Sequence, residues 1–230
     1  MIRVVHADDH RLFRLGLAEL LRAMQGIQIV GTAETGEDAI SQVRSLRPNI
    51  VLMDVLMPGM GGLEATARIL KSEPSTAVIA LTECTEVPFP AQMLKAGALG
   101  YLTKDVEVQE LEQAIKRVFM GRRYVCNHVA QELACYAFDA SVESPYEILS
   151  NREMQIMLMV VNCHKVRKIS GDLHLSPKTV NSYRYRIFDK LNVSSDVELV
   201  LLAVKHGVIL TSLKPLPAGR ASELRPAIAG

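Results

Sequence analysis

Residues 49–54 read Asn-Ile-Val-Leu-Met-Asp, a short apolar run that ends in a carboxylate. A near-continuous apolar run of this length is typical of a strand that is buried on both faces of a sheet. Similar runs at 2–7, 27–33, 77–82 and 99–103 alternate with amphipathic stretches at 12–24, 37–46, 63–72, 91–96 and 108–120. This alternation predicts an α/β fold with a doubly wound, five-stranded parallel sheet and right-handed crossovers.

The alternation stops after residue 120. Residues 121–145 carry Gly, Ser and Pro and show little periodicity beyond a short helical stretch at 127–137, which predicts a linker. Residues 146–211 show only helical patterns, at 150–162, 166–173, 176–191 and 195–206, and predict a small all-α domain of four helices. Residues 212–230 are rich in Pro, Gly and Ala and are expected to be disordered. The first domain is therefore expected over residues 1–120.

Polar residues stand at or just past the ends of four predicted strands. Asp8 and Asp9 follow the first strand, Asp54 follows the third, Thr82 ends the fourth and Lys104 follows the fifth. In the flavodoxin-like strand order 2-1-3-4-5 the first and third strands are neighbours, and ligands bind outside the carboxyl ends of such a sheet. Three carboxylates in one pocket repel one another unless positive charge lies among them, so Lys104 and a hard divalent ion, Mg²⁺ above all, are the candidates. Each residue alone could be a helix cap or a solvated charge, but together they indicate a site.

This pattern resembles the receiver domain of bacterial two-component response regulators. The likeness covers residues 1–120 and rests on Asp8-Asp9, on Asp54 followed by Met57-Pro58-Gly59, and on Thr82 and Lys104. The resemblance implies that Asp54 accepts phosphate from the histidine of a sensor kinase and becomes a 4-aspartylphosphate.

The same resemblance assigns roles to the residues around Asp54. It implies that Mg²⁺ is the cofactor, held by Asp8, Asp9, Asp54 and the backbone carbonyl of Leu56. It also implies that Lys104 and Thr82 contact the phosphoryl group, and that Thr82 and the aromatic Tyr101 form the switch. These roles agree with the chemistry, because a divalent ion and an ammonium neutralise the charge that develops on the phosphoryl oxygens.

Helix-start signals mark the second domain. Ser150 followed by Glu153 forms a capping box, and Ser176-Pro177 places a cap and a proline at the start of a later helix. Two short helices joined by a tight turn at 174–175 predict a helix-turn-helix.

The helix predicted at 176–191 has two different faces. Val180, Ile187 and Leu191 form an inward apolar face, while Lys178, Ser182, Tyr185 and Asp189 lie opposite them. Such a polar face suits phosphate contacts and base reading, and it is equally typical of an ordinary solvated helix.

The second domain resembles the LuxR-type DNA-binding domain through Leu149-Ser-x-Arg-Glu, Leu175-Ser-Pro-Lys-Thr-Val-Asn and Lys190-Leu-Asn-Val. A receiver followed by this domain is the NarL/FixJ class of response regulator, and the run 175–192 is similar to its GacA/UvrY branch. The resemblance implies a transcription factor that activates small regulatory RNA genes. Carried over by position, Asn181, Ser182 and Tyr185 would read bases, and Lys178, Thr179 and Lys190 would hold phosphates. Residues 162–165 depart from the glycine-led turn of many family members, which leaves the start of the second helix open.

The implied partners are a sensor histidine kinase, double-stranded DNA with dyad symmetry and a second copy of the chain. Val197, Leu201 and Val204 form an apolar stripe on the last helix, which either packs on the domain core or forms the homodimer face.

Charge and composition agree with this organisation. Residues 1–120 hold 12 basic and 15 acidic residues, whereas residues 145–211 hold 9 basic and 6 acidic ones, so a polyanion is the natural partner of the second domain. No apolar run approaches the roughly 20 residues of a membrane span. Four cysteines without a Cys-x-x-Cys spacing indicate reduced thiols and a cytoplasmic location.

Two other functions fit parts of this pattern. The carboxylates could serve a phosphohydrolase that acts on an outside substrate, although the apolar, Gly-rich stretch 56–62 offers no substrate pocket. The second domain could be a protein-docking module. A response regulator that is not itself an enzyme on outside substrates accounts for both halves of the sequence.

Overall fold

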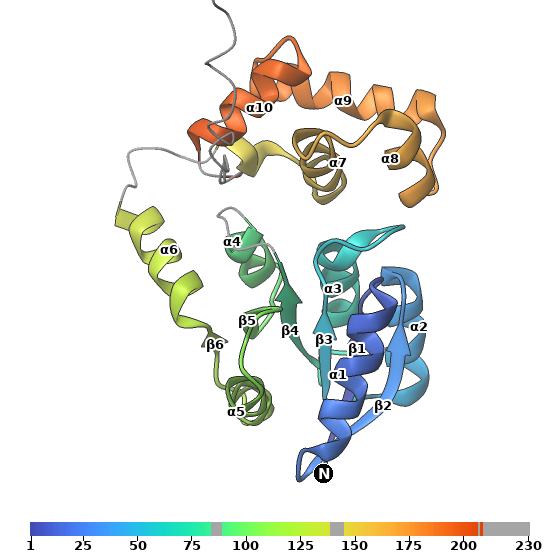
Figure 1. Ribbon diagram of the computed structural model, residues 1–230, viewed down its shortest axis with the longest axis vertical. Coiled ribbons are helices and arrows are strands. Elements are labelled where there is room, and N and C mark those ends of the chain that lie inside the picture. Colours follow the sequence, from blue (N-terminus) through green and yellow to red (C-terminus); the bar gives the residue numbers. More distant parts are fainter. Residues whose placement is uncertain (84–88, 139–144, 207, 209–230) are drawn as a thin grey trace, which may run out of the picture.

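The computed structural model describes residues 1–83, 89–138, 145–206 and 208 of the chain. Figure 1 shows an α/β domain built on one sheet, with an all-helical domain above it. The predicted disordered tail at 212–230 and residues 139–144 of the predicted linker lie outside the described residues. No helix among those described is both long and apolar enough to span a bilayer.

The sheet is parallel throughout, in the order β2-β1-β3-β4-β5-β6. The predicted strands appear as β1 (Ile2–Ala7), β2 (Ile27–Ala33), β3 (Ile50–Met53), β4 (Ala77–Thr82) and β5 (Gly100–Thr103). Every side chain of β3 is fully buried, as its apolar run predicts for a strand covered on both faces. The doubly wound parallel fold is confirmed.

The prediction of five strands was wrong, because a sixth strand lies in the predicted linker. β6 (Tyr124–Val125) pairs with Gly100 and Tyr101 of β5. Its two residues are too few to produce a recognisable strand pattern. The linker also contains α6 (Asn127–Phe138), which agrees with the helical stretch expected there.

The helices of the first domain lie within two residues of their predicted bounds. They are α1 (Arg11–Ala23), α2 (Gly36–Leu46), α3 (Gly61–Ser72), α4 (Phe89–Lys95) and α5 (Val108–Phe119). Each buries an apolar stripe, such as Leu111, Ala114, Ile115 and Val118 of α5, which fixes the ends of the neighbouring strands in place.

The second domain consists of the 3₁₀ turn η1 (Pro145–Ile148) and four helices: α7 (Asn151–Val161), α8 (Val166–Asp172), α9 (Pro177–Leu191) and α10 (Asp196–Lys205). Ser150 and Glu153 form the predicted capping box, and the side chain of Ser176 caps α9. α8 starts at Val166 as predicted, although the turn before it contains Cys163 with a φ of 59° in place of a glycine.

The packing order of the helices determines which helix surfaces of the second domain remain exposed to solvent. α7 packs against α3 of the first domain, and α9 packs against the other sides of α7 and α8. In Figure 1, α9 and α10 therefore lie on the far side of α7 from the sheet.

Candidate functional site

The predicted carboxylates meet at one edge of the sheet. Ala7 of β1 pairs with Met53 of β3, so the residues that follow these two strands come side by side. Asp8 is fully buried and Asp54 is 2% exposed, while the side chain of Asp9 is 32% exposed. The adjacency of the first and third strands, which the sequence argument required, is confirmed.

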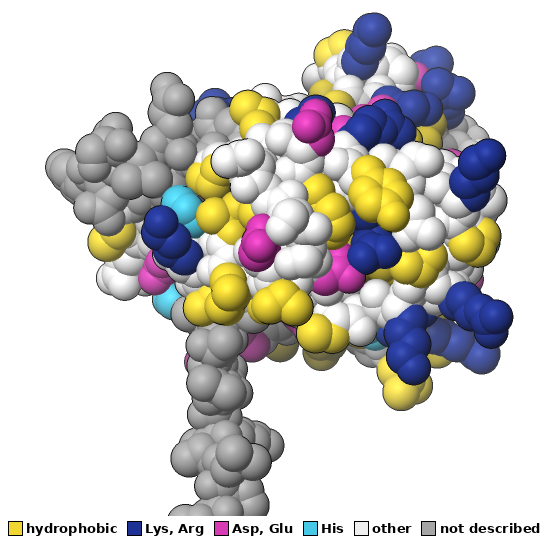
Figure 2. Space-filling view, turned by 90° about the horizontal axis from the view of Figure 1, so that it is seen from above, with side chains coloured by type: hydrophobic (Ala, Val, Ile, Leu, Met, Phe, Trp, Pro, Cys, Tyr) yellow, Lys and Arg dark blue, Asp and Glu magenta, His cyan; other side chains and the backbone are white. Residues whose placement is uncertain are grey.

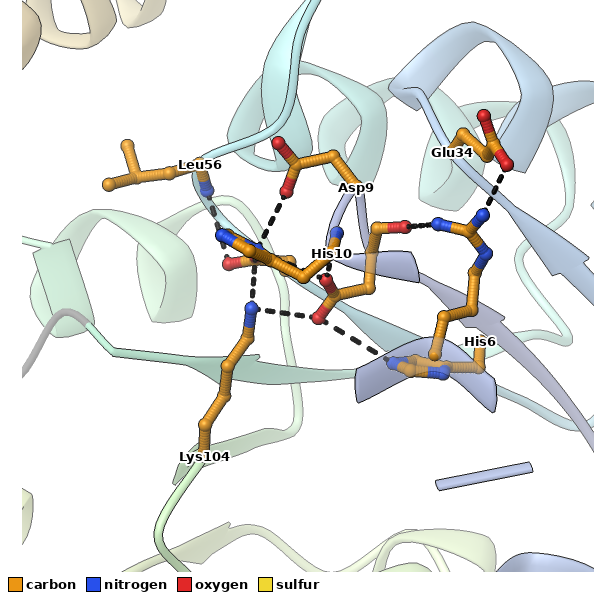
Figure 3. Close-up of polar contacts among 9 residues, drawn as sticks. His6, Asp9, His10, Glu34, Leu56 and Lys104 are labelled. Carbon is orange, nitrogen blue, oxygen red and sulfur yellow. Dashed lines mark hydrogen bonds and ion pairs between the residues drawn. The ribbon is translucent and has the colours of Figure 1, made fainter. Parts of the chain in front are cut away.

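Lys104 joins the carboxylates from the end of β5. Its Nζ lies 2.7 Å from Asp54 Oδ2 and 2.8 Å from Asp8 Oδ2 (Figure 3). The Lys104 side chain is only 8% exposed, so both ion pairs are shielded from water. One ammonium among three carboxylates leaves a local excess of negative charge, which suits a divalent cation.

The pKa values of the two buried partners depend on each other. Burial raises the pKa of Asp54, and the positive charge and hydrogen bond of Lys104 oppose that rise. Burial alone would lower the pKa of Lys104, but the charges and hydrogen bonds of Asp54 and Asp8 together outweigh it and the pKa is raised. The ion pair therefore keeps the lysine charged beside the carboxylate.

Several of these side chains could hold a metal ion together. One ligand atom from each of Asp8, Asp9, His10 and Asp54 lies within 4.8 Å of the others. Carboxylate oxygens are the ligands that Mg²⁺ prefers, so the donor set fits that ion. The amide of Leu56 donates to Asp54 Oδ1 over 3.3 Å, which places the backbone of Leu56 at the same carboxylate.

His10 was missed by sequence reasoning. Its Nδ1 lies 3.1 Å from Asp9 Oδ1 and 3.5 Å from Asp8 Oδ1, and the imidazole is 63% exposed. Its place directly after the Asp8-Asp9 pair was the available signal. An imidazole suits transition metals better than Mg²⁺. His10 therefore lies beside the carboxylates but is not expected to be a ligand of Mg²⁺.

Thr82 and Tyr101 complete the predicted set. Thr82 ends β4 and is 1% exposed, and a hydrogen bond from its side chain lowers the pKa of Asp54 against the effect of burial. Tyr101 lies on β5 and is fully buried. The structure thus brings Asp8, Asp9, Asp54, Thr82 and Lys104 to one edge, with Tyr101 on the neighbouring strand.

A second layer beneath the carboxylates was also missed. Arg14 of α1 donates to the backbone oxygen of Asp8 over 2.5 Å and pairs with Glu34. His6 is buried beside Asp8, and burial lowers its pKa to about 4, so its imidazole is neutral at pH 7. These residues come from separate elements with no shared motif, so no sequence pattern could have identified them.

Glycines shape the loop after Asp54. A Cβ on Gly62 would lie 1.8 Å from the carbonyl oxygen of Asp54, so only glycine fits where α3 begins. Gly59 has a φ of +74°, which a glycine adopts without strain. Backbone close approach thus explains why the stretch after the carboxylate is rich in glycine.

The predicted DNA-reading residues lie on α9. Lys178, Ser182 and Tyr185 are exposed, and Tyr185 is 70% exposed despite its large ring. Thr179 and Asn181 are half-buried, and Asn181 Oδ1 accepts a hydrogen bond from Arg184 over 2.9 Å. Val180, Ile187 and Leu191 are buried, so the predicted division of this helix into two faces is confirmed.

Lys190, the sixth of the predicted DNA contacts, is held inside its own domain. Its Nζ lies 2.6 Å from Glu153 Oε2 and donates to the carbonyl of Ile148 over 3.2 Å. Glu153 is the buried capping-box residue, so Lys190 has a structural partner, whereas Lys178 has no acidic partner among the described residues.

Most of the cations on α8 and α9 have no acidic partner in the part of the chain that the structure describes. Arg184 pairs with Asp196 and Lys190 with Glu153. Within the described ranges, no carboxylate forms an ion pair with the exposed cations Lys165, Arg167, Lys168, Lys178 and Arg186. Seen from above in Figure 2, Lys and Arg side chains gather on the side where α8 and the start of α9 lie in Figure 1.

Known families match both domains. The response regulator receiver domain matches residues 4–116, and the LuxR family of bacterial regulatory proteins matches residues 147–203. The response regulator GacA of Pseudomonas protegens is 54% identical over 93% of this chain and 100% of its own length. The chain is a two-component response regulator.

A second relative and a solved structure have the same two-domain organisation as this response regulator. The response regulator UvrY of Escherichia coli K12 is 49% identical over 90% of this chain and 96% of its own. A solved structure of the RcsB response regulator of Salmonella typhimurium shares the fold, with a TM-score of 0.66 and 23% identity over 91% of this chain and 98% of that one. The chain thus joins a receiver to a LuxR-type domain, the architecture of a DNA-binding transcription regulator.

Proposed function

We propose that Asp54 is the phosphorylated residue of this response regulator and that its phosphate comes from the histidine of a sensor kinase. The observation that carries the proposal is the contact of Lys104 with both Asp54 and Asp8 inside a buried carboxylate cluster. Asp54 combines a strand-end carboxylate, an ammonium within 2.7 Å and further acidic metal donors.

The positions of these atoms support the following transfer. A carboxylate oxygen of Asp54 forms the new O–P bond while the P–N bond of the phosphohistidine breaks, and its electron pair returns to the imidazole. The ammonium of Lys104 stabilises the charge that develops on the phosphoryl oxygens and is already in place, which removes most of the cost of reorganisation. Thr82 lies at the end of the neighbouring strand β4, from which its hydroxyl contacts the new phosphoryl group.

Mg²⁺ is the cofactor that this site would hold. Asp8, Asp9 and Asp54 would supply carboxylate oxygens, and Leu56, whose amide donates to Asp54, would supply its backbone carbonyl. When bound, the ion neutralises charge on the phosphoryl oxygens and so assists the transfer.

The phosphorylated state would be passed on through Thr82 and Tyr101. Thr82 is within hydrogen-bonding reach of Asp54 and Tyr101 lies on β5, the strand that pairs with the strand of Thr82. A movement of Thr82 toward a phosphoryl group would free space for a different rotamer of the buried Tyr101 ring.

The second domain would bind promoter DNA through α9. The helix has 15 residues, about 22 Å in length, and presents Asn181, Ser182 and Tyr185 on the side away from its core. A major groove about 12 Å wide admits such a helix. The exposed cations of α8 and α9, above all Lys178 at the start of α9, would contact phosphates on either side of the groove.

A homodimer on a dyad-symmetric site is the proposed DNA-bound form. Val197 and Leu201 of α10 are 68% and 62% exposed, and Val204 is 37% exposed. Core packing therefore does not account for this stripe, which is available to a second copy of the chain. The resemblance to the GacA/UvrY branch adds the expectation that the target promoters include those of small regulatory RNAs. A cytoplasmic location fits these partners.

The test of the proposed function separates it from a phosphohydrolase. The full chain is incubated with acetyl phosphate and Mg²⁺, and both bound and released phosphate are followed. One acid-labile phosphate per chain is expected, whereas sustained turnover would support a hydrolase. Genome-wide mapping of bound DNA, with the wild type compared with Asp54→Ala, then tests whether DNA occupancy follows phosphorylation. Binding to proteins alone would leave no promoter enrichment.

A further inference from the structure

The second domain grips the backbone of the loop that follows Asp54. Gln155 Nε2 donates to the carbonyl of Met57 over 2.8 Å, and Arg152 Nη1 donates to the carbonyl of Gly59. In return, the amide of Gly59 donates to the carbonyl of Asp172, the last residue of α8, over 3.1 Å. We call residues 55–60 the phosphoacceptor loop. All three contacts use main-chain atoms of this loop, so they depend on its path and not on its side chains.

The two gripping side chains are themselves fixed. Arg152 Nη1 also donates to Gln155 Oε1 over 2.7 Å, and its Nη2 donates to the carbonyl of Leu173 over 2.9 Å. Gln155 is 8% exposed, and a Cβ on Gly61 would lie only 2.7 Å from its Nε2. A buried amide in such a tight site pays a desolvation penalty whenever its carbonyl partner moves away.

These contacts lie next to the backbone carbonyl of Leu56, which would complete the metal site. On one side, the amide of Leu56 donates to Asp54 Oδ1 over 3.3 Å. On the other side, Gln155 holds the carbonyl of Met57. The peptide group that contains the Leu56 carbonyl therefore lies between two peptide groups that are held by hydrogen bonds. Because peptide groups are planar, only a few backbone dihedral angles remain free there.

We propose that Arg152 and Gln155 are positioning residues of the phosphoacceptor site, supplied to it by the DNA-binding domain. The proposal rests on the proposed function in one respect, namely that the Leu56 carbonyl is a ligand of Mg²⁺. Held by Gln155 and Arg152, the loop keeps that carbonyl in place before the ion arrives. Because binding equilibria are reciprocal, an ion on the loop must strengthen the contact between the domains by the same factor by which the contact strengthens ion binding.

The contact does not work by covering the DNA-reading helix. α7 lies between α9 and the first domain, and Lys178, Ser182 and Tyr185 remain exposed while the grip is formed. The grip therefore couples the two domains through the position of the loop and not through steric blockage.

The test uses the full chain with Gln155→Met, which nearly preserves volume and removes the donor. The matched control is Gln113→Met on the exposed side of α5. Hydrogen exchange of the loop amides, followed by mass spectrometry, should become about tenfold faster in Gln155→Met, as expected for the loss of one buried hydrogen bond. Calorimetric titration with Mg²⁺ should show affinity lowered about threefold, and the control should match the wild type in both measurements.

A second variant guards against a merely structural effect. Arg152→Lys keeps the positive charge but offers fewer donors, and it should give intermediate loop exchange. Binding to random duplex DNA, which depends on an intact second domain, should stay at the wild-type level in both variants. Unchanged loop exchange, or unchanged Mg²⁺ affinity, in both variants would overturn the proposal. Neither measurement involves phosphate transfer, so failure of labelling at Asp54 would be seen separately.

Discussion

Asp8, Asp54 and Lys104 stand at the carboxyl ends of β1, β3 and β5, where each side chain is less than one-tenth exposed and lies within 2.8 Å of a charged partner. On α8 and α9, by contrast, Lys178 and Arg186 are exposed, and within the described part of the chain no carboxylate pairs with them. The same kinds of side chain thus occur in two opposite settings within one molecule.

Burial and pairing decide which chemistry each region can support. Buried, paired charges are fixed in position, so they can stabilise charge that develops in a reaction without first rearranging. Exposed cations without an acidic partner keep their positive charge available, so they suit a long polyanion whose counterions they release. Changes in the first region should therefore have large effects on phosphorylation, and changes in the second should weaken DNA binding in smaller, salt-dependent steps.

The largest expected effect comes from Asp54→Asn. An amide cannot form the acyl phosphate, so acid-labile label from acetyl phosphate should be abolished. The measurement is phosphate incorporation per chain, with Asp38→Asn, an exposed acid on α2, as the control that should label normally. Label at full stoichiometry in Asp54→Asn would place the phosphoacceptor elsewhere.

Asp9→Ala should have the next largest effect, because it removes one anionic oxygen donor from the proposed Mg²⁺ site. The Mg²⁺ concentration needed for half-maximal labelling should rise roughly a hundredfold. His10→Ala is the matched comparison, since His10 Nδ1 lies 3.1 Å from Asp9 but offers a softer nitrogen ligand. If His10→Ala raised the Mg²⁺ requirement as much as Asp9→Ala, the ion would lie nearer the imidazole than we infer.

A smaller effect is expected on the reading face of α9. Asn181→Ala should cost about 1–3 kcal/mol of binding free energy at the cognate site and leave random duplex DNA nearly unaffected. Salt titrations on cognate and scrambled duplexes measure both. Equal weakening on the two duplexes would mean that α9 grips backbone at this position and does not read bases.

The smallest effects should separate two lysines of the same helix. Lys178→Ala should weaken cognate and random DNA alike and lower the salt slope by about one per half-site contact, with no change in stability. Lys190→Ala should instead lower the free energy of unfolding by about 1–2 kcal/mol, because Glu153 loses its cation.

The pH dependence of stability tests this assignment of Lys190. Burial by itself would raise the pKa of Glu153, but hydrogen bonds from Lys190 and Ser150 outweigh it and the pKa is lowered. The stabilisation is therefore present above the ordinary pKa of a glutamate and is lost as the pH falls through the lowered value. Urea unfolding of Lys190→Ala should differ most from the wild type at neutral pH. A flatter salt slope at unchanged stability would show that Lys190 holds phosphate after all.

The sequence predicted what depends on local pattern and on topology. The apolar run 50–53 marked β3, and strand order then required Asp8 and Asp54 to meet. Ser150 and Glu153, three residues apart, predicted the capping box that begins α7. Contacts between segments that are distant in the sequence have no local pattern that predicts them. Lys190 contacts Glu153, which is 37 residues away in the sequence. Gln155 contacts Met57, which is 98 residues away, and does so only through the backbone carbonyl of Met57. β6 escaped notice because two residues carry no periodicity.

The glycine at the start of α3 determines how this region can vary among mutants. At Gly62 any side chain would begin 1.8 Å from the carbonyl oxygen of Asp54, whereas a methyl group on Gly16 of α1 meets nothing within 4 Å. In a library that samples every residue at both positions, survivors should keep glycine at 62 and accept many residues at 16, with alanine there favouring the helix. Two glycines of the same domain thus differ in their tolerance of substitution, and the intolerant one lies against the backbone of the proposed phosphoacceptor.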